Sequence, residues 1–292
     1  MQKPNNSNLS LPLLYKGKVR DVYEVDSTRL LMVATDRLSA FDVVFDEPIN
    51  KKGVVLTSVS NYWFDKTKNI IPNHLTNEPL ESVLPDTEAK LLMGRAVIVK
   101  KLKPLAVEAI VRGYIIGSGW KDYKKNGSIC GIPLPKGLEL AQKLPKAIYT
   151  PSTKADMGDH DVNIDYSATV KIIGEKLAKQ VRDVSIEIYS FAAKLASERG
   201  IIIADTKLEF GLDENNCLTL MDEILTPDSS RFWPKATYAV GSSPKSFDKQ
   251  IVRDYLETLD WNKAPPAPKL PQSIIEKTSN KYFEVQQLLT QE

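Results

Sequence analysis

The chain is poor in cysteine and histidine and has no long apolar run. Its two cysteines, Cys130 and Cys217, lie outside any CxxC or Cys/His spacing, so the sequence predicts no thiolate metal cage. We interpret them as free thiols in a reducing compartment. No segment approaches the roughly 20 apolar residues that span a bilayer, and residues 1–18 lack the apolar core of a secretion signal. We therefore expect a cytoplasmic protein that does not bind membranes.

An excess of charge of one sign is also absent. The chain has 39 Lys and Arg against 37 Asp and Glu, a formal net charge of +2, which provides no general attraction to nucleic acid or membranes. Aromatic residues are scattered and do not alternate with lysines, so no nucleic-acid platform is expected. The length of 292 residues fits one large or two modest domains. Any electrostatic specialisation must therefore be local.

The order of the expected elements predicts an α+β fold with two lobes. A hairpin, a helix and two more strands are expected in the first part, at residues 15–25 with 29–35, 56–67, 95–102 and 105–111. We place the lobe boundary in the crossover at 101–104. Residues 1–102 then form a smaller, mostly antiparallel β lobe, and residues 103–292 form a larger α+β lobe.

Loops and long helices are expected in the remaining segments. Residues 35–45 are rich in charge and hydroxyl groups, and residues 111–137 contain six glycines and two prolines, so both are predicted to be mainly loop. Apolar spacing predicts a helix over 175–199, separated from a shorter one by Gly174 and ended by Gly200. Two further helices are expected at 246–259 and 273–289.

The main chemical signal is a predicted hairpin, residues 201–210 with 217–223. Its first strand opens with three isoleucines and an alanine, which is typical of a strand buried on both faces. Asp205, Lys207 and Glu209 follow at a spacing of two, so they share one face.

The returning strand of this hairpin should bring Asp222 and Glu223 beside the start of the first strand. Carboxylates gathered in this way repel one another unless a cation lies among them. Mg²⁺ prefers carboxylate oxygens and commonly bridges to substrate phosphates. We therefore predict a metal–nucleotide site, with a solvated face of ordinary ion pairs as the alternative.

Other short motifs suit anions, although each is weak alone. Gly17 lies between Lys16 and Lys18, where backbone amides and ammonium groups could meet a phosphate. No GK[ST] opens a helix there, so the motif is not a Walker A loop, and a charged turn is the alternative. Residues 227–234 offer two serines and an arginine, and residues 111–120 offer an arginine and a serine among glycines. Structural turns are the alternative for both segments.

His160 is flanked by Asp159 and Asp161. It could act as a base or a ligand, but the sequence offers no third partner. A surface histidine or a substrate contact is the preferred interpretation.

Six motifs, in order along nearly the whole chain, resemble the SAICAR synthetase family. They are YKGKVRDVYEV, ATDRLSAFDVVF, VRGYIIGSGW, TPSTKADMGDHD, IIIADTKLEFG and MDEILTPDSSRFWP. The STKADMGDHD segment and the length resemble the longer, monofunctional fungal-type form more than the shorter bacterial form. The resemblance implies a two-lobed kinase/ATP-grasp-like fold with ATP between the lobes, and it favours a monomer.

The resemblance also implies the reaction, an ATP-dependent ligation in de novo purine biosynthesis. ATP, the carboxyaminoimidazole ribonucleotide CAIR and L-aspartate would give ADP, phosphate and SAICAR. A carboxylate is a poor acyl donor, so the route would pass through an acyl phosphate that the aspartate amine attacks, with Mg²⁺ bridging phosphates.

Site residues carried over by motif fall into three overlapping groups. The ATP-binding group is Lys16, Gly17, Lys18, Val19, Arg20, Lys101, Glu209 and Asp222. The substrate-binding group is Arg112, Ser118, Arg231, Ser230, Asp36, Ser39, Lys207 and Asp161. The catalytic group is Lys207, Asp222 and Glu209, of which Glu209 and Asp222 would also hold the metal. The roles of Asp205, Glu223 and His160 stay open, as does the group that accepts the amine proton.

Two alternatives to the ligase remain at this point. A small-molecule or protein kinase on a similar fold would need a hydroxyl acceptor and an HRD-type aspartate, and no HRD stretch occurs. A non-catalytic nucleotide-binding module would tolerate loss of the acids or arginines, and all of these are present.

Overall fold

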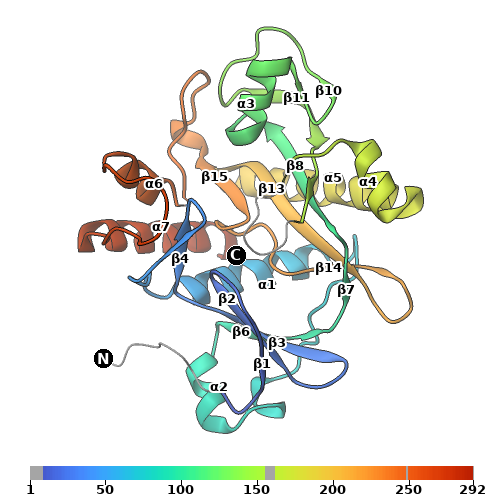
Figure 1. Cartoon of the computed structure of the whole chain (residues 1–292), viewed down its shortest axis with the longest axis vertical. Coiled ribbons are helices and arrows are strands. Elements are labelled where there is room, and N and C mark those ends of the chain that lie inside the picture. The colour runs from blue at the N-terminus through green and yellow to red at the C-terminus, as the bar shows by residue number, and fades with distance from the viewer. Residues whose placement is uncertain (1–8, 155–161, 248, 292) are drawn as a thin grey trace.

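Two antiparallel sheets organise the chain (Figure 1). The structure is a computed structural model and describes residues 9–154, 162–247 and 249–291. The smaller sheet has the strand order β1-β2-β3-β6. Its strands are β1 (Leu13–Lys16), β2 (Arg20–Glu24), β3 (Arg29–Ala34) and β6 (Ala96–Lys100). The β2–β3 pairing confirms the predicted hairpin, and β1 adds a second hairpin whose turn is residues 17–19.

The larger sheet has seven strands and runs β11-β8-β13-β14, with three further strands paired to β8 or β13. Its strands are β7 (Lys103–Pro104), β8 (Val107–Tyr114), β11 (Lys143–Tyr149), β12 (Ser152–Thr153), β13 (Ile201–Leu212), β14 (Leu218–Met221) and β15 (Ser230–Pro234). Strand β13 pairs with β8, β14, β15 and β7. Its first residues are apolar because both faces are buried: Ile201 and Ile203 pack in the main core, and Ile202 and Ala204 pack with Trp233.

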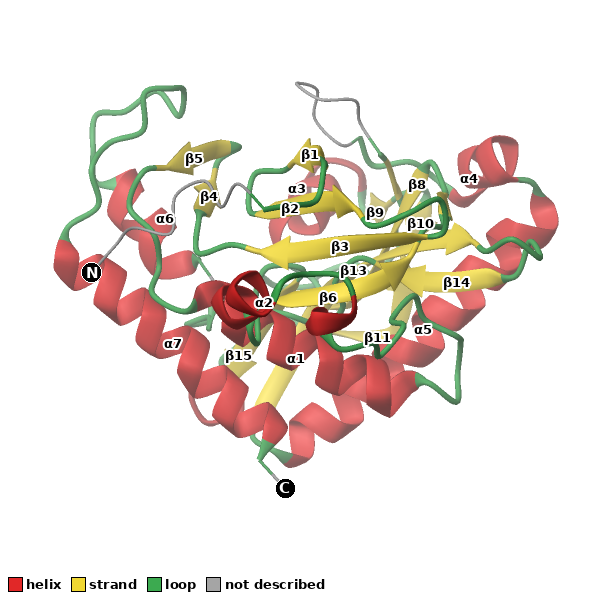
Figure 2. Cartoon of the chain, turned by 90° about the horizontal axis from the view of Figure 1, so that it is seen from below, coloured by secondary structure: helices red, strands yellow, loops and turns green. Residues whose placement is uncertain are grey.

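Helices cover the larger sheet and close the main core. In Figure 2 the long helices α5 and α7 run along one side of the strands. The helices are α1 (Lys52–Thr67), α2 (Asp86–Leu92), α3 (Gly117–Asn126), α4 (Tyr166–Ile173), α5 (Glu175–Glu198), α6 (Gln250–Glu257) and α7 (Gln272–Thr290). Short 3-10 turns lie at Leu80–Ser82 and Lys235–Thr237. Trp63 of α1, Phe210 of β13 and Tyr282 of α7 share the main core, so the two ends of the chain are packed together.

Several predicted helix boundaries are confirmed. Gly174 separates α4 from α5, and Gly200 follows α5 with φ 77°, the left-handed conformation that commonly ends a helix. Helix α1 begins four residues before the predicted 56–67 segment. None of the helices in the described ranges is both long and apolar enough to cross a membrane.

Both segments that we expected to be mainly loop contain regular structure. Residues 35–45 include the small hairpin β4 (Leu38–Ala40) and β5 (Val43–Phe45), whose buried side chains pack against residues of α6. Residues 111–137 include the end of β8, helix α3 and a hairpin of β9 (Ser128–Ile129) and β10 (Ile132–Pro133). Gly113, Gly117 and Gly119 allow close packing, whereas the other three glycines of this segment, Gly127, Gly131 and Gly137, adopt positive φ.

The chain leaves the small sheet after β6 and enters the large sheet at β7, which is where the crossover was predicted. Helix α1 precedes this point yet packs in the main core beside β13. The division into lobes at residue 102 therefore stays a prediction.

Candidate active site

Lys207 lies at the middle of β13 between two carboxylates. Its Nζ donates to Glu108 Oε1 on β8 at 2.6 Å and lies 3.5 Å from Glu209 Oε1. Burial opposes its charged form, but Glu209 and Glu108 together raise the pKa of Lys207 above its usual value. The side chain is therefore a fixed ammonium at neutral pH, suited to anions and unsuited to act as a base.

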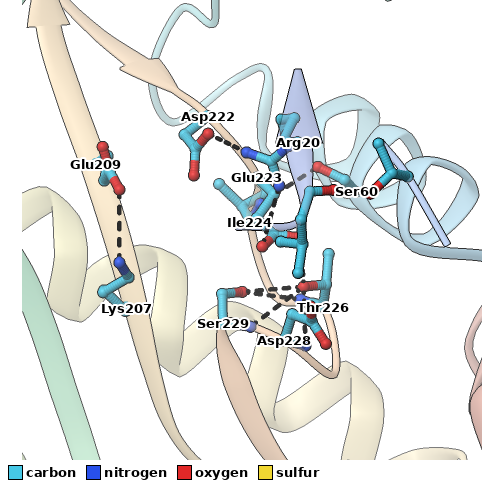
Figure 3. Close-up of polar contacts among 12 residues, drawn as sticks. Arg20, Ser60, Lys207, Glu209, Asp222, Glu223, Ile224, Thr226, Asp228 and Ser229 are labelled. Atoms are coloured by element: carbon cyan, nitrogen blue, oxygen red, sulfur yellow. Dashed lines mark hydrogen bonds and ion pairs between the residues drawn. The ribbon is translucent and has the colours of Figure 1, made fainter. Parts of the chain in front are cut away.

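Asp222 and Glu223 end β14 and face Arg20 of the small sheet (Figure 3). Arg20 donates to Asp222 and lies 3.0 Å from Glu223, so one guanidinium joins the two sheets. Burial opposes the charge on Asp222, yet Arg20 and Lys207 lower its pKa. Asp222 has φ 67°, which is uncommon for a residue other than glycine and is typical of strained functional positions.

The acids are arranged differently from our expectation in two ways. Glu209 pairs with Met221, so Asp222 follows beside the middle of β13, not its start; the turn 213–216 sets this register. The carboxylates are also offset by the protein's own cations, since Lys154 contacts Glu209 at 2.5 Å. Within the described ranges no cluster of three or more His, Cys, Asp or Glu side chains could hold a metal. Mutual repulsion of the acids is therefore no argument for a metal here.

An arginine pair lies on the other side of Lys207, where β8, β13 and β15 run together. Asp205 on β13 is opposite both Arg112 on β8 and Arg231 on β15. Asp205 Oδ2 accepts from Arg112 Nη1 at 2.9 Å and also from Arg231. Arg112 Nη2 donates to Ser118 Oγ at 3.0 Å. The structure thus brings together Arg112, Ser118 and Arg231 of the predicted substrate-binding group, and Asp205 orients the two arginines.

Gly117 at the start of α3 allows this arrangement. A side chain there would place its Cβ 2.5 Å from Arg231 Nη2, and the φ of 60° also favours glycine. The neighbouring Ser118 lines a cavity of about 770 Å³ that Glu108 and Lys207 also line. Ser118, which accepts a hydrogen bond from Arg112, therefore shares this cavity with Lys207, while Arg112 and Arg231 lie behind Ser118 and are not among the lining residues.

Replacing Asp205 with asparagine tests whether it orients the two arginines. We expect Asp205→Asn to lower the free energy of unfolding by about 2 kcal/mol in phosphate-free buffer, because a buried charge-assisted hydrogen bond is lost. Inorganic phosphate should restore part of this stability by neutralising the two guanidinium groups. Thermal unfolding with and without phosphate measures both effects. If native protein and variant respond equally to phosphate, Asp205 does not hold the pair.

The predicted phosphate hairpin is present at the turn between β1 and β2. Gly17 N donates to Arg20 O at 2.7 Å, and a Cβ at Gly17 would meet the same oxygen at 2.7 Å, so this turn requires glycine. Arg37 donates to Gly17 O at 2.9 Å and to Lys18 O at 3.1 Å, which fixes the turn, and Val19 O accepts from the Thr35 hydroxyl at 2.8 Å.

The lysines of the predicted ATP group lie at separate places. Lys16 ends β1 opposite Asp21, and Lys18 contacts Asp42 at 2.5 Å. Lys101 directly follows β6 and forms an exposed ion pair with Glu24 at 3.1 Å.

The remaining predicted substrate residues are not gathered at the cavity. Asp36 accepts from Gly53 N at 2.9 Å and from Arg95 at 3.1 Å, so it supports the start of α1. Ser39 lies on β4, and buried Ser230 donates to the Thr206 hydroxyl at 2.8 Å. Asp161, like His160, lies outside the described residues.

Comparison with known proteins identifies the family. The SAICAR synthetase family model matches residues 13–268. The chain belongs to the SAICAR synthetase family. Phosphoribosylaminoimidazole-succinocarboxamide synthase of Neisseria meningitidis serogroup B is 59% identical, over 98% of this chain and 100% of the relative. Membership of this family supports the ligase of purine biosynthesis and excludes the two alternatives, the kinase and the non-catalytic nucleotide-binding module.

Two solved structures of SAICAR synthetases are similar in fold to this chain. The SAICAR synthase of Saccharomyces cerevisiae, complexed with SAICAR, is 43% identical with a TM-score of 0.90, covering 99% of this chain and 98% of that one. A Type-2 SAICAR synthetase in complex with ADP is 25% identical with a TM-score of 0.69, covering 95% and 97%. The likeness to the fungal form is confirmed, and the full-length match to Neisseria places the same form in bacteria.

Several site residues of this SAICAR synthetase carried no signal in the sequence. Glu108 meets Lys207 through the pairing of β8 with β13, and Ser152 meets Glu108 through the pairing of β12 with β8. Lys154 reaches Glu209 from outside the hairpin. The structure also shows the contacts of two residues whose roles were left open. Asp205 forms ion pairs with Arg112 and Arg231, and Glu223 forms one with Arg20.

Proposed function

We propose that the chain joins L-aspartate to the carboxylate of CAIR, with ATP as the energy source, through an acyl phosphate. The observation that carries the proposal is the position of Lys207. Its ammonium lines the cavity that Ser118 also lines, and it lies beside Glu209 of the acid group. A cation at that place can stabilise the charge of a phosphoryl group moving between a nucleotide and a carboxylate.

CAIR would occupy the cavity with its 5′-phosphate at the arginine pair. Arg112 and Arg231 offer planar guanidinium groups, which suit phosphate, and Ser118 adds a hydroxyl. With the phosphate held there, the carboxylate on the imidazole ring of CAIR would extend toward Lys207, which lies in the same sheet as the two arginines. Asp205 keeps both arginines oriented before the substrate arrives, which lowers the cost of ordering on binding.

ATP would lie with its phosphates at the turn of residues 17–19 and toward Arg20. The fixed backbone of this turn and the lysines beside it provide donors and positive charge. Arg20 already joins the small sheet to Asp222, so nucleotide bound here would meet the acid group directly.

Glu209 and Asp222 fit Mg²⁺, because this ion is commonly held by one or two carboxylates together with substrate phosphates. Glu209 lies on β13 opposite Met221, the last residue of β14, and Asp222 follows Met221 directly. Bound there, Mg²⁺ would neutralise phosphate charge. Arg20, Lys154 and Lys207 offset these carboxylates in the protein alone. We further propose that the protein is a cytoplasmic monomer, as the resemblance favours.

The direct test uses purified protein with ATP, Mg²⁺, CAIR and L-aspartate, and follows SAICAR by absorbance. Product that depends on aspartate supports the proposal, and its absence would show that the proposed reaction is wrong. Phosphate and ADP release should equal SAICAR formation.

Asp222→Ala tests the acid group. We expect kcat to fall by about 100-fold with the fold intact, because the variant loses a carboxylate beside the transferring phosphate. Asp183→Ala on α5 is the matched control, since Asp183 pairs with Lys179 and Arg182 at the surface and its removal should leave turnover unchanged. Normal turnover of Asp222→Ala would place the chemistry elsewhere.

A further inference from the structure

Glu108 is a buried carboxylate that the sequence motifs did not assign. It lies on β8, where its side chain is 5% exposed, between the apolar residues Val107 and Ala109. Burying a carboxylate costs free energy unless it is paired and hydrogen-bonded. Its Oε1 accepts from Lys207 Nζ at 2.6 Å, and its Oε2 accepts from Ser152 Oγ at 3.1 Å.

Three strands produce this arrangement. Ser152 on β12 is directly opposite Glu108, and the pairing of β8 with β13 places Lys207 opposite Ile110. The strand register therefore fixes the positions of Ser152 and Lys207, the two residues that donate hydrogen bonds to Glu108. Glu108, Ser152 and Lys207 all line the cavity of about 770 Å³. A purely structural ion pair would have no reason to lie at the cavity wall.

We propose that Glu108 is a positioning residue for the ligase reaction, holding the Lys207 ammonium at the cavity wall where the substrate carboxylate is to be phosphorylated. The inference rests on the proposed role of Lys207 and adds the residue that directs it. Ser152 completes the arrangement by fixing the carboxylate of Glu108. Without this carboxylate, Lys207 would turn toward Glu209 on its other side, away from the cavity.

The charges that face Lys207 make the inference measurable. Glu108 approaches from β8, Glu209 from β13, Asp222 from the end of β14, and Lys154 adds an opposing positive charge. Burial opposes the ammonium, while Glu209 and Glu108 raise the pKa of Lys207. Removing the Glu108 carboxylate leaves Glu209 as the remaining ion-pair partner on the other side, so the Lys207 ammonium should turn toward Glu209 in Glu108→Ala.

Crystal structures give a readout that does not depend on activity. Native protein and Glu108→Ala are compared for the position of the Lys207 ammonium. We expect Lys207 Nζ to lie at the cavity wall in the native protein and to turn toward Glu209 in Glu108→Ala. Glu257→Ala, which breaks an exposed pair with Lys263, is the matched control and should leave Lys207 in its native position.

Kinetics separate positioning from a structural role. Glu108→Ala should lower kcat by about 100-fold, the cost of a reacting group displaced by about 1 Å, with little change in KM for ATP. Glu108→Gln keeps an acceptor for Lys207, so it should retain more activity than Glu108→Ala. Circular dichroism and thermal unfolding identify any variant that fails to fold.

Two outcomes would overturn the inference. One is a Lys207 ammonium that keeps its native position in the crystal structure of folded Glu108→Ala. The other is native turnover in folded Glu108→Ala while Lys207→Met is inactive, which would leave the proposed function standing. Failure of native protein to form SAICAR would instead contradict the proposed function.

Discussion

Lys207→Met is expected to lower kcat by about 100- to 1,000-fold with little change in fold. Methionine keeps much of the length and apolar stem of lysine but removes the ammonium. The native ammonium lies 2.6 Å from Glu108 and 3.5 Å from Glu209, at the cavity wall. In the variant no fixed cation remains at that point to stabilise the transferring phosphoryl group.

The pH dependence of native turnover should show no loss from Lys207 at neutral or mildly alkaline pH. Its pKa is raised, so the group stays charged as the pH increases. Lys207→Arg keeps the charge but places it on a planar fork, so we expect activity between that of the native enzyme and the Met variant.

Lys179→Met is the matched control for Lys207→Met. Lys179 lies on α5, two-thirds exposed, and pairs with Asp183 at 3.0 Å, so its removal should leave kcat unchanged. Steady-state rates at saturating ATP, CAIR and aspartate measure the effect, and circular dichroism checks the fold. Native kcat in Lys207→Met would remove Lys207 from the chemical step.

Asp228→Ala is expected to lower the free energy of unfolding by about 3–5 kcal/mol, because it leaves buried cations unpaired. Asp228 is 3% exposed and contacts two lysines. Lys52 Nζ donates to it at 2.6 Å, and Lys249 Nζ lies 3.2 Å away. Tyr282 also donates to its second oxygen at 2.6 Å.

Asp228 and its three partners come from distant parts of the chain, so the loss should affect the whole fold. Lys52 begins α1, Tyr282 belongs to α7, and Asp228 lies in the turn that leads to β15. Burial lowers the pKa of Lys52, partly offset by Asp228. Since a lowered lysine pKa costs stability as the pH falls, the deficit of the variant should be larger near pH 6 than near pH 9.

Denaturant unfolding at both pH values measures this prediction. Asp183→Ala, at an exposed pair on α5, should cost less than about 1 kcal/mol and serves as the control. A second variant, Tyr282→Phe, removes one hydrogen bond and should cost about 1 kcal/mol. If Asp228→Ala costs no more than the exposed control, the buried cluster does not stabilise the fold.

Features that depend on the local spacing of residues could be predicted from the sequence. The period of 3.6 residues predicted α5, and Gly174 and Gly200 marked its ends. The spacing of two placed Asp205, Lys207 and Glu209 on one face of a strand, and the structure has them on β13.

The prediction of a loop was wrong where a glycine is required by packing against a distant part of the chain. Gly117 was interpreted as part of a loop, yet it begins α3 and leaves room for Arg231, which is more than a hundred residues away in the chain. Likewise, repulsion among the acids suggested a metal, but Arg20 and Lys154 already offset them. Neither partner could be found from local spacing.

The sequence alone was enough for the family, the main acidic hairpin and the residue types suited to phosphate, because motifs and periodicity are local properties of the chain. Only the tertiary structure decided which charges meet. Strand register brought Glu108 to Lys207 and placed Asp205 between two arginines, while the packing of α1 on α7 brought Lys52 to Asp228. Such pairings depend on contacts across many residues, and no spacing along the chain encodes them.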